Sequence, residues 1–234
     1  MSDWAFAPEL LHAIGLSLRL AATSSLILLV IGVPLANWLN TSRMRGVVVL
    51  ETLVSLPVVL PPTVIGFYLL VLMSPREPLG AAWLSLFGQP LPFTFSGLVV
   101  GSVVYSLPFA VQPFQAAFRD VKPELQQSAL ALGLTRRQTF WHIVLPLSRH
   151  GILTGVSLSF AHTMGEFGVV LMLGGNIPGQ TRVASIALYD EAQQLNYANA
   201  HAYAAILLAI SFVILVAIAL LQRRQQHRLL LPRQ

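Results

Sequence analysis

The sequence predicts an all-α integral membrane protein that forms a single domain, residues 1–234, with about five transmembrane helices. The chain is 55% hydrophobic and only 10% charged, whereas soluble domains carry about 25% charged residues. A helix needs roughly 20 apolar residues to cross the hydrocarbon core, and five stretches satisfy this length: 11–39, 46–73, 96–118, 150–173 and 200–221. Inside them the charged residues are Arg19, Glu51 and Glu166.

The first stretch is predicted to be a retained span. The only charges between Met1 and Leu10 are Asp3 and Glu9, whereas a cleaved signal peptide begins with a basic region. Residues 79–95 are too short for a span and contain glycines and prolines, so we expect this segment at the membrane interface, with Trp83 and Phe87 as anchors.

Basic residues predict the orientation of the chain. The turn at 40–45, the segment 119–149 and the C-terminal tail hold eleven lysines and arginines, whereas the alternate loops hold only Arg76 and Arg182. The positive-inside rule then places the N-terminus outside and the C-terminus in the cytoplasm. The net charge of +5 therefore indicates topology, with the basic tail on anionic lipid headgroups, and not nucleic-acid binding.

Prolines interrupt two neighbouring spans. Each proline removes a backbone donor and bends a helix. A single such residue indicates an ordinary kink, but several together with Gln112 indicate a pathway between kinked helices. The prolines are Pro57, Pro61 and Pro62 in the second span, and Pro108 and Pro113 in the third. The last span lacks proline and is predicted to be peripheral scaffold.

The polar segment 119–149 is predicted to form two short helices. Pro123 suits a first helical position and Gly133 a left-handed stop, which gives a helix over 123–132. Thr135 and Gln138 have the spacing of a capping box for a second helix over 136–145, ended by Pro146.

The first of these helices carries an apolar stripe. Leu125, Ala129 and Leu132 recur at helical spacing beside a polar face, and Arg136 follows near the start of the second helix. Connections of this length are uncommon unless they are functional. The segment is therefore predicted to dock into a groove of a partner protein.

The same segment resembles the Glu-Ala-Ala cytoplasmic loop of importer-type ABC permeases. It reads Gln127-Ser128-Ala129, three residues, Gly133, and then the Ile-Val-Leu-Pro run that ends at Pro146. The resemblance implies the importer-type ABC permease fold, with a coupling helix that docks onto an ATP-binding subunit. Two positions depart from the family pattern, because Gln127 replaces the acidic residue and Ser128 an alanine. The resemblance therefore implies anchoring by hydrogen bonds at Gln127.

Other stretches are similar to molybdate permeases in particular. These are residues 162–190, "LPPTVIGFYLL" in the second span and "YSLPFAVQPFQAAF" in the third. Sulfate and tungstate permeases share parts of the Gly-Glu-Phe-Gly motif, so these substrates stay open as alternatives. The loop residues Asn176, Pro178, Thr181 and Arg182, expected on the periplasmic side, favour molybdate.

The resemblance implies a multi-pass protein of the bacterial inner membrane that assembles with several partners. These are a second copy of the chain, two ATP-binding cassette subunits, and a periplasmic or lipoprotein molybdate-binding protein. The ATPase subunits would use ATP and Mg²⁺, and this chain would bind no cofactor. It is not expected to be an enzyme: its single lysine, Lys122, lies outside any Walker A pattern, and its histidines lack metal-ligand spacing. A small ion-coupled carrier is disfavoured, since such carriers show internal repeats and relays of ionisable residues.

Charged and polar residues in the spans give further expectations. A bare carboxylate in an oxyanion pathway would repel the cargo, so Glu166 is interpreted as structural and not as a gate. Arg19 is its predicted partner, because the two lie roughly 30 and 25 Å from the cytoplasmic ends of their spans at 1.5 Å per residue. His162 is expected to hydrogen-bond across helices or to face a cavity, and Glu51 to pair with Arg45.

Overall fold

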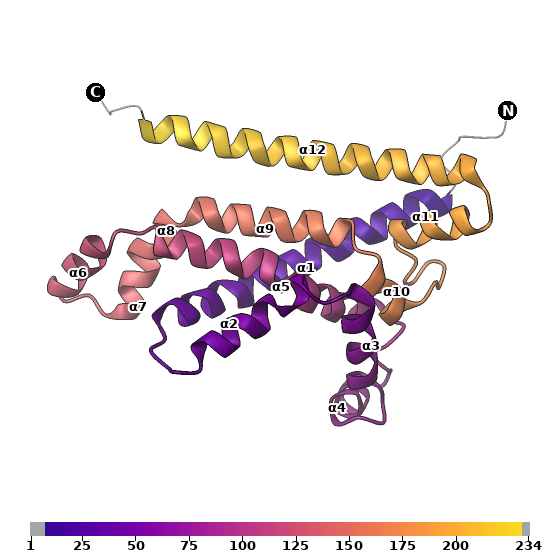
Figure 1. Ribbon diagram of the computed structural model, residues 1–234, viewed down its shortest axis with the longest axis horizontal. Coiled ribbons are helices and arrows are strands. Elements are labelled where there is room, and N and C mark those ends of the chain that lie inside the picture. The colour runs from indigo at the N-terminus through magenta and orange to yellow at the C-terminus, as the bar shows by residue number, and fades with distance from the viewer. Residues whose placement is uncertain (1–7, 231–234) are drawn as a thin grey trace.

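Long helices packed side by side form the body of the protein (Figure 1). The computed structural model describes residues 8–230; for Ile218 and residues 221–230 it describes the backbone and not the side chains. Three helices are long and apolar enough to cross a membrane by themselves: α1 (Pro8–Thr41), α5 (Phe95–Arg119) and the Tyr197–Ala217 part of α12 (Tyr197–Leu230). Two further bent helix pairs raise the number to as many as five, which agrees with the prediction.

The second predicted span is broken and not continuous. It consists of α2 (Val47–Ser55), a 3₁₀ turn (Leu56–Val58) and α3 (Pro62–Leu72), and the two parts meet at 112°. The break lies at Pro61, which has an extended backbone, directly before the Pro62 that begins α3. A residue before proline is disfavoured in the α region, so the double proline ends one helix and starts another.

The fourth predicted span, 150–173, is also divided. It comprises α9 (Arg149–Met164) and α10 (Gly168–Gly174), with Gly165, Glu166 and Phe167 between them. The sixteen residues of α9 are too few to span a membrane. α9 reaches the length of a span only together with residues 136–147, and these two parts are bent by 71° relative to each other. Glycines on both sides of Glu166 permit this local unwinding.

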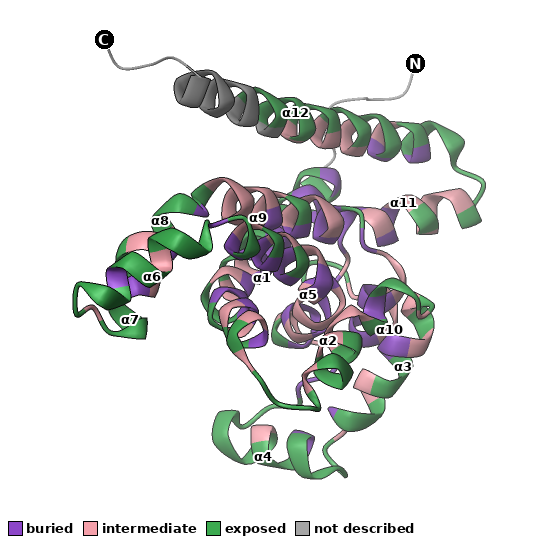
Figure 2. Ribbon diagram, turned by 60° about the vertical axis from the view of Figure 1, so that its left-hand side comes forward, coloured by how far each residue is buried: buried purple, intermediate pink, exposed green. Residues whose placement is uncertain are grey.

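The core lies where α1, α5 and α9 approach one another (Figure 2). Small residues let the backbones come close: a Cβ atom at Gly155 of α9 would lie 2.5 Å from the ring of Phe114 and 2.8 Å from the carbonyl oxygen of Ala110. Gly32 of α1 faces the same ring, at 3.1 Å. Phe114 is fully buried, so two glycines hold this aromatic side chain between three helices.

The remaining helices surround this core. The short α4 (Pro78–Phe87) has ten residues, too few to span, and its Trp83 and Phe87 rings stack at 4.1 Å. α11 (Ala184–Gln193) lies under one end of α12, and α12 runs along the outside of the bundle, as predicted for peripheral scaffold (Figure 1).

The two ends of the bundle differ in the segments they present. The α1–α2 turn, residues 119–149 and the C-terminal end of α12 lie at one end, whereas the start of α1 and α11 lie at the other (Figure 1). This arrangement groups the basic segments as the topology prediction requires. The lipid contacts predicted for the tail lie outside the described side chains.

Candidate functional site

The helix α6 (Pro123–Ala131) projects from the basic end of the bundle. It begins at Pro123 and stops before Gly133, which has the positive φ of +88°. The Leu134 amide donates to the Ala129 carbonyl at 3.1 Å and the Gly133 amide to the Leu130 carbonyl at 3.0 Å, which is the hydrogen-bond pattern of a glycine-stopped helix. The predicted helix and its stop are confirmed.

The surface of α6 is open to a partner. Leu132 is 81% exposed and Leu125 46% exposed, whereas Ala129 is buried against the rest of the segment. Gln127 and Ser128 are exposed as well. The predicted stripe is therefore divided: Ala129 holds the helix in place, and the two leucines remain uncovered.

The second helical part of the segment begins as predicted. The Thr135 amide donates to Gln138 Oε1 at 2.8 Å, and the Gln138 amide donates to Thr135 Oγ1 at 3.2 Å, which completes the capping box. This box starts α7 (Arg136–Thr139), and both Arg136 and Arg137 are exposed at its first turn.

The prediction that Pro146 ends this helix is wrong. Helical winding continues through a π-helical turn (Phe140–Val144) and α8 (Leu145–Leu147), and breaks only at Ser148. Pro146 directly follows the π-helical turn, and the helix passes through the proline without ending. The Ser148 hydroxyl then donates to the Ala117 carbonyl of α5 at 3.0 Å, which attaches the break to the bundle.

The segment is also joined to the bundle core through apolar side chains. Phe140 packs edge-on against Phe118 of α5, with ring centroids 5.6 Å apart, and Val144 is buried in the same cluster as Val121. Beside these contacts a cavity of about 500 Å³ opens between Lys122, Leu125 and Pro146, among other residues. A force on α6 or α7 would therefore reach α5 through packed side chains.

A polar cluster at the same end corrects the predicted partner of Glu51. The Arg119 guanidinium pairs with Glu51 Oε1 at 3.2 Å, and Gln115 Nε2 donates to the same oxygen at 3.0 Å. Arg119 Nε also donates to Asn40 Oδ1 at 2.9 Å. Arg45 lies only six residues from Glu51 in sequence, but the neighbouring α5 presents Arg119 directly to the carboxylate. Sequence reasoning missed Gln115 and Asn40, for which no local signal exists.

Two of the predicted polar residues make bonds between helices. His162 Nδ1 lies 2.9 Å from Ser106 Oγ of α5, and the His162 ring stacks on Phe109 at 3.9 Å. The expectation that His162 hydrogen-bonds across helices is therefore confirmed. Gln112 Nε2 donates to Ser55 Oγ at 3.1 Å, so it joins α5 to the end of α2.

The predicted pairing of Glu166 with Arg19 is wrong. The carboxylate of Glu166 is buried between α9 and α10, and both of its oxygens are without a hydrogen-bond partner among the described residues. Arg19 is exposed, and its guanidinium carbon lies over the ring of Phe95, 4.6 Å from the ring centroid. Similar depth in the membrane does not decide which side of a helix a residue occupies, and here the two side chains occupy different sides.

The loop before α11 is closed by its own side chains. The Arg182 guanidinium donates to Asn176 Oδ1 at 2.6 Å and pairs with Asp190 at 3.0 Å. Thr181 is buried and donates to the Gly174 carbonyl at 2.6 Å. The predicted loop residues Asn176, Thr181 and Arg182 therefore stabilise the folded loop by bonds within it and to α11.

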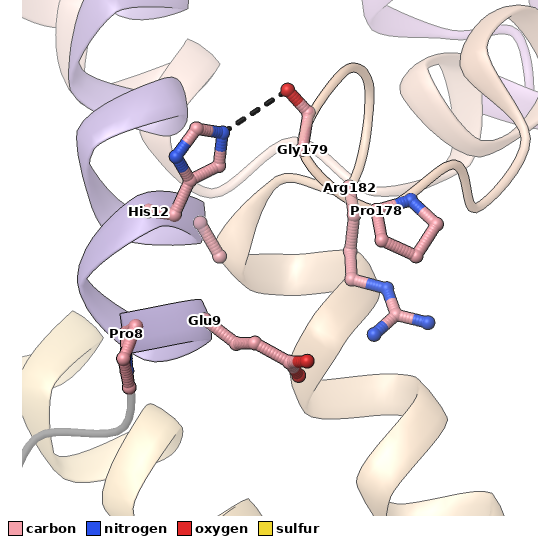
Figure 3. A pocket seen from close by; sticks show the side chains of 7 residues that line it. Pro8, Glu9, His12, Pro178, Gly179 and Arg182 are labelled. Carbon is pink, nitrogen blue, oxygen red and sulfur yellow. Dashed lines mark hydrogen bonds between the residues drawn. The ribbon is translucent and has the colours of Figure 1, made fainter.

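The loop also borders a small cavity. Pro178, Glu9 and Arg182 help to line this cavity of about 260 Å³, and His12 Nε2 lies 3.1 Å from the Gly179 carbonyl oxygen across it (Figure 3). The described residues contain no cluster of three or more side chains able to hold a metal ion.

Comparison with known proteins identifies the class to which this arrangement belongs. Residues 14–230 match the family described as "Binding-protein-dependent transport system inner membrane component", and the chain belongs to this family of ABC importer permeases. It is accordingly a multi-pass inner-membrane protein.

Three relatives narrow the resemblance within the family. The chain is 48% identical to the molybdenum transport system permease protein ModB of Azotobacter vinelandii, over 89% of this chain and 92% of that one. It is 35% identical to the putative molybdenum transport system permease protein YvgM of Bacillus subtilis, over 94% and 96%. It is 34% identical to the sulfate transport system permease protein CysT of Escherichia coli, over 94% and 79%. The resemblance to molybdate permeases is thus confirmed.

Solved structures of more distant proteins share the fold. A chain of the MetNI methionine ABC transporter has a TM-score of 0.75 at 15% identity, with coverage of 95% of this chain and 99% of that one. A chain of a bacterial alginate ABC transporter, in complex with an alginate-bound periplasmic protein, has a TM-score of 0.75 at 22% identity, over 94% and 80%. The predicted importer-type permease fold is therefore confirmed.

Proposed function

We propose that this chain is the membrane subunit of an ABC importer that translocates molybdate, with the energy supplied by ATP hydrolysis in a separate subunit. The observation that supports the ATP coupling is α6, a glycine-stopped helix at the basic end that is followed directly by Leu132, whose apolar side chain is 81% exposed. An apolar side chain that is largely exposed in a polar segment is suited to bind in a groove of a partner protein.

The contacts of the segment suggest how such coupling works. An ATPase that grips Leu132, Gln127 and Ser128 moves α6, and the movement passes through Phe140 and Val144 to Phe118 of α5. α5 in turn packs on α1 and α9. Closure of the two ATPases on ATP would thereby change the relative tilt of the spans and open the pathway to the outside.

The proposed assembly contains two copies of this chain, two ATPases and an external binding protein. Two copies are expected because five spans form only a thin wall. The periplasmic protein held by the related alginate transporter supports a binding protein at the outer end. The basic segments at the α6 end support a cytoplasmic position of that end and an outside N-terminus.

The transport experiment separates the substrate from the mechanism. The permease is co-purified with its ATPase and binding protein and reconstituted in liposomes. ATP-dependent uptake of labelled molybdate, tungstate and sulfate is then measured. We expect uptake of molybdate in preference to the other two. A preference for sulfate, as in the CysT relatives, would overturn the substrate and retain the mechanism. ATP-independent uptake driven by an ion gradient would overturn the mechanism.

The docking role of α6 is tested at Leu132. We expect Leu132→Ser to reduce ATPase co-purification and substrate-stimulated ATP hydrolysis while the permease keeps its melting temperature, since this side chain packs on little of the chain itself. Leu86→Ser is the matched control, because Leu86 is 77% exposed on the distant α4. Equal ATPase binding by both variants would contradict the docking role.

A further inference from the structure

A cavity of about 580 Å³ lies at the outer end of α1 and is built from three separate parts of the chain. Gly15 and Arg19 contribute from α1, Gln89 from the loop before α5, Ser96 from the first turn of α5, and Gln180 from the loop before α11. Its volume falls in the range of small-molecule sites. Apart from Gly15, each of these residues ends in a group that can donate a hydrogen bond.

Arg19 is the charged group of this cavity, and its donors are free. Among the residues that the structure describes, Arg19 makes neither an ion pair nor a hydrogen bond, and its one contact of this kind is with the face of the Phe95 ring. A cation–π contact attracts the charge of the guanidinium and uses none of its N–H donors in hydrogen bonds to oxygen. Phe95 therefore holds the guanidinium beside the cavity, and its donors remain available.

The charge around Arg19 is uncompensated. No aspartate or glutamate is among the residues that line the cavity. Glu9 lines the adjoining smaller cavity together with Arg182 (Figure 3), and Arg182 is itself paired with Asp190. The first residues of the 25-residue α5 also border the cavity, and the partial positive charge at a helix N-terminus has the same sign as the guanidinium.

We propose that this Arg19 cavity binds one tetrahedral, doubly charged oxyanion at the outer end of the pathway. The guanidinium would hold two oxygens with parallel N–H donors, and the amides of Gln89 and Gln180 would satisfy the others. The inference rests on the proposed function, because it assigns the entry point of the same anion. Since Arg19 does not pair with Glu166, the proposal also gives this arginine a role.

The absence of cysteine from the chain permits a direct binding measurement. Ser96 borders the cavity, so Ser96→Cys introduces a single reactive thiol there. The permease–ATPase complex is placed in phosphatidylcholine nanodiscs without binding protein, and the rate of maleimide labelling is followed against molybdate, tungstate and sulfate at constant ionic strength. We expect saturable slowing by each anion, and no slowing for Ser85→Cys on α4.

Charge variants in the Ser96→Cys chain identify the ligand group. We expect Arg19→Gln to raise the half-protecting molybdate concentration about tenfold or more, as for the loss of a hydrogen bond to a charged group. Arg19→Lys is expected to lie between this variant and the parent, because lysine keeps the charge without the planar fork. Arg76→Gln, which removes an exposed arginine away from the cavity, is expected to change nothing. Protection that is absent, or equal with and without Arg19, would overturn the site.

Two further measurements are needed. The first distinguishes binding of a free oxyanion from binding of a lipid phosphate, and the second tests the Arg19 site and the proposed transport function separately. If labelling responds to phosphatidylglycerol in the nanodisc and not to molybdate, Arg19 binds lipid phosphate and the oxyanion site is overturned. Uptake by the parent chain in liposomes tests the proposed function separately. Uptake without protection overturns the Arg19 site alone, whereas protection without uptake of any oxyanion supports the site and overturns the permease function.

Discussion

The α6–α8 segment closes its first helix with Gly133 at a φ of +88° and starts its second with a capping box, whereas α1, α5 and α9 meet through glycines set against Phe114. In the segment, order comes from bonds between residues three to five positions apart. In the three-helix junction, it comes from the fit between residues far apart in sequence. The segment can therefore keep its shape with its apolar surface uncovered, and the junction cannot.

The same difference assigns the two regions different tasks in the proposed transport cycle. A locally stabilised segment remains folded while its partner moves it, because few of its own bonds reach the bundle. The junction transmits the movement, because close-packed backbones shift together and do not deform gradually.

The largest expected effect comes from disturbing the junction at Gly155. The added methyl group of Gly155→Ala would approach the Ala110 carbonyl oxygen at 2.8 Å, and backbone cannot move aside as a side-chain end can. We expect a loss of about 1–3 kcal/mol of stability, typical of overpacking, measured as a lower melting temperature in detergent. Gly15→Ala is the matched control, since nothing lies within 4 Å of the added atom. Equal melting temperatures would show that the junction is loosely packed.

The next effect comes from the glycine stop of α6. We expect Gly133→Ala to cost about 1–2 kcal/mol locally, because a side chain disfavours the left-handed region, although no atom lies within 4 Å of the added carbon. The strain should loosen the α6–α7 connection, seen as faster amide hydrogen exchange at Leu132 and Leu134, and lower substrate-stimulated ATP hydrolysis. Unchanged amide exchange and unchanged ATP hydrolysis would show that the glycine stop is not needed for coupling to the ATPase.

This contrast also explains which features can be predicted from sequence. The helix start at Pro123, the stop at Gly133 and the Thr135–Gln138 capping box are confirmed, since each depends on a few consecutive residues. The long apolar runs likewise predict the spans. The prolines of the second span correctly predict that it is broken, but they do not give the angle of 112° between its parts, because the size of a bend depends on what packs against it.

Side-chain partners in the bundle lie beyond sequence reasoning. Arg19 and Glu166 have similar predicted depths, but depth along a helix says nothing about rotation about its axis. Sequence proximity favours Arg45 as the partner of Glu51, whereas α5 brings in Arg119 from 68 positions away. Such pairs follow from how helices pack, and only the three-dimensional arrangement reveals them.

A smaller effect is expected from the Glu51–Arg119 pair, which joins α2 to the last residue of α5, just before the α6–α8 segment. The Arg119 side chain is 61% exposed and that of Glu51 33%, so solvent screens the attraction. We expect a coupling energy of about 0.2–1 kcal/mol from a double-mutant cycle of Glu51→Ala and Arg119→Ala, decreasing at high salt. A coupling that is larger and independent of salt would mean that the cluster with Gln115 and Asn40 behaves as a buried network.

The smallest expected change in stability is that of Glu166→Gln, at the break between α9 and α10. The carboxylate oxygens make no well-formed hydrogen bond among the described residues, and the nearby Ser102 hydroxyl can donate equally to an amide oxygen. The neutral amide of similar size therefore keeps this contact and spares the burial of a charge. We expect a melting temperature equal to or above that of the parent chain. Glu51→Gln is the matched control and should melt slightly lower, because it weakens real bonds to Arg119 and Gln115. A marked loss of stability at Glu166→Gln would restore the structural role expected for this carboxylate from the sequence and would place a bonding partner in the assembled dimer.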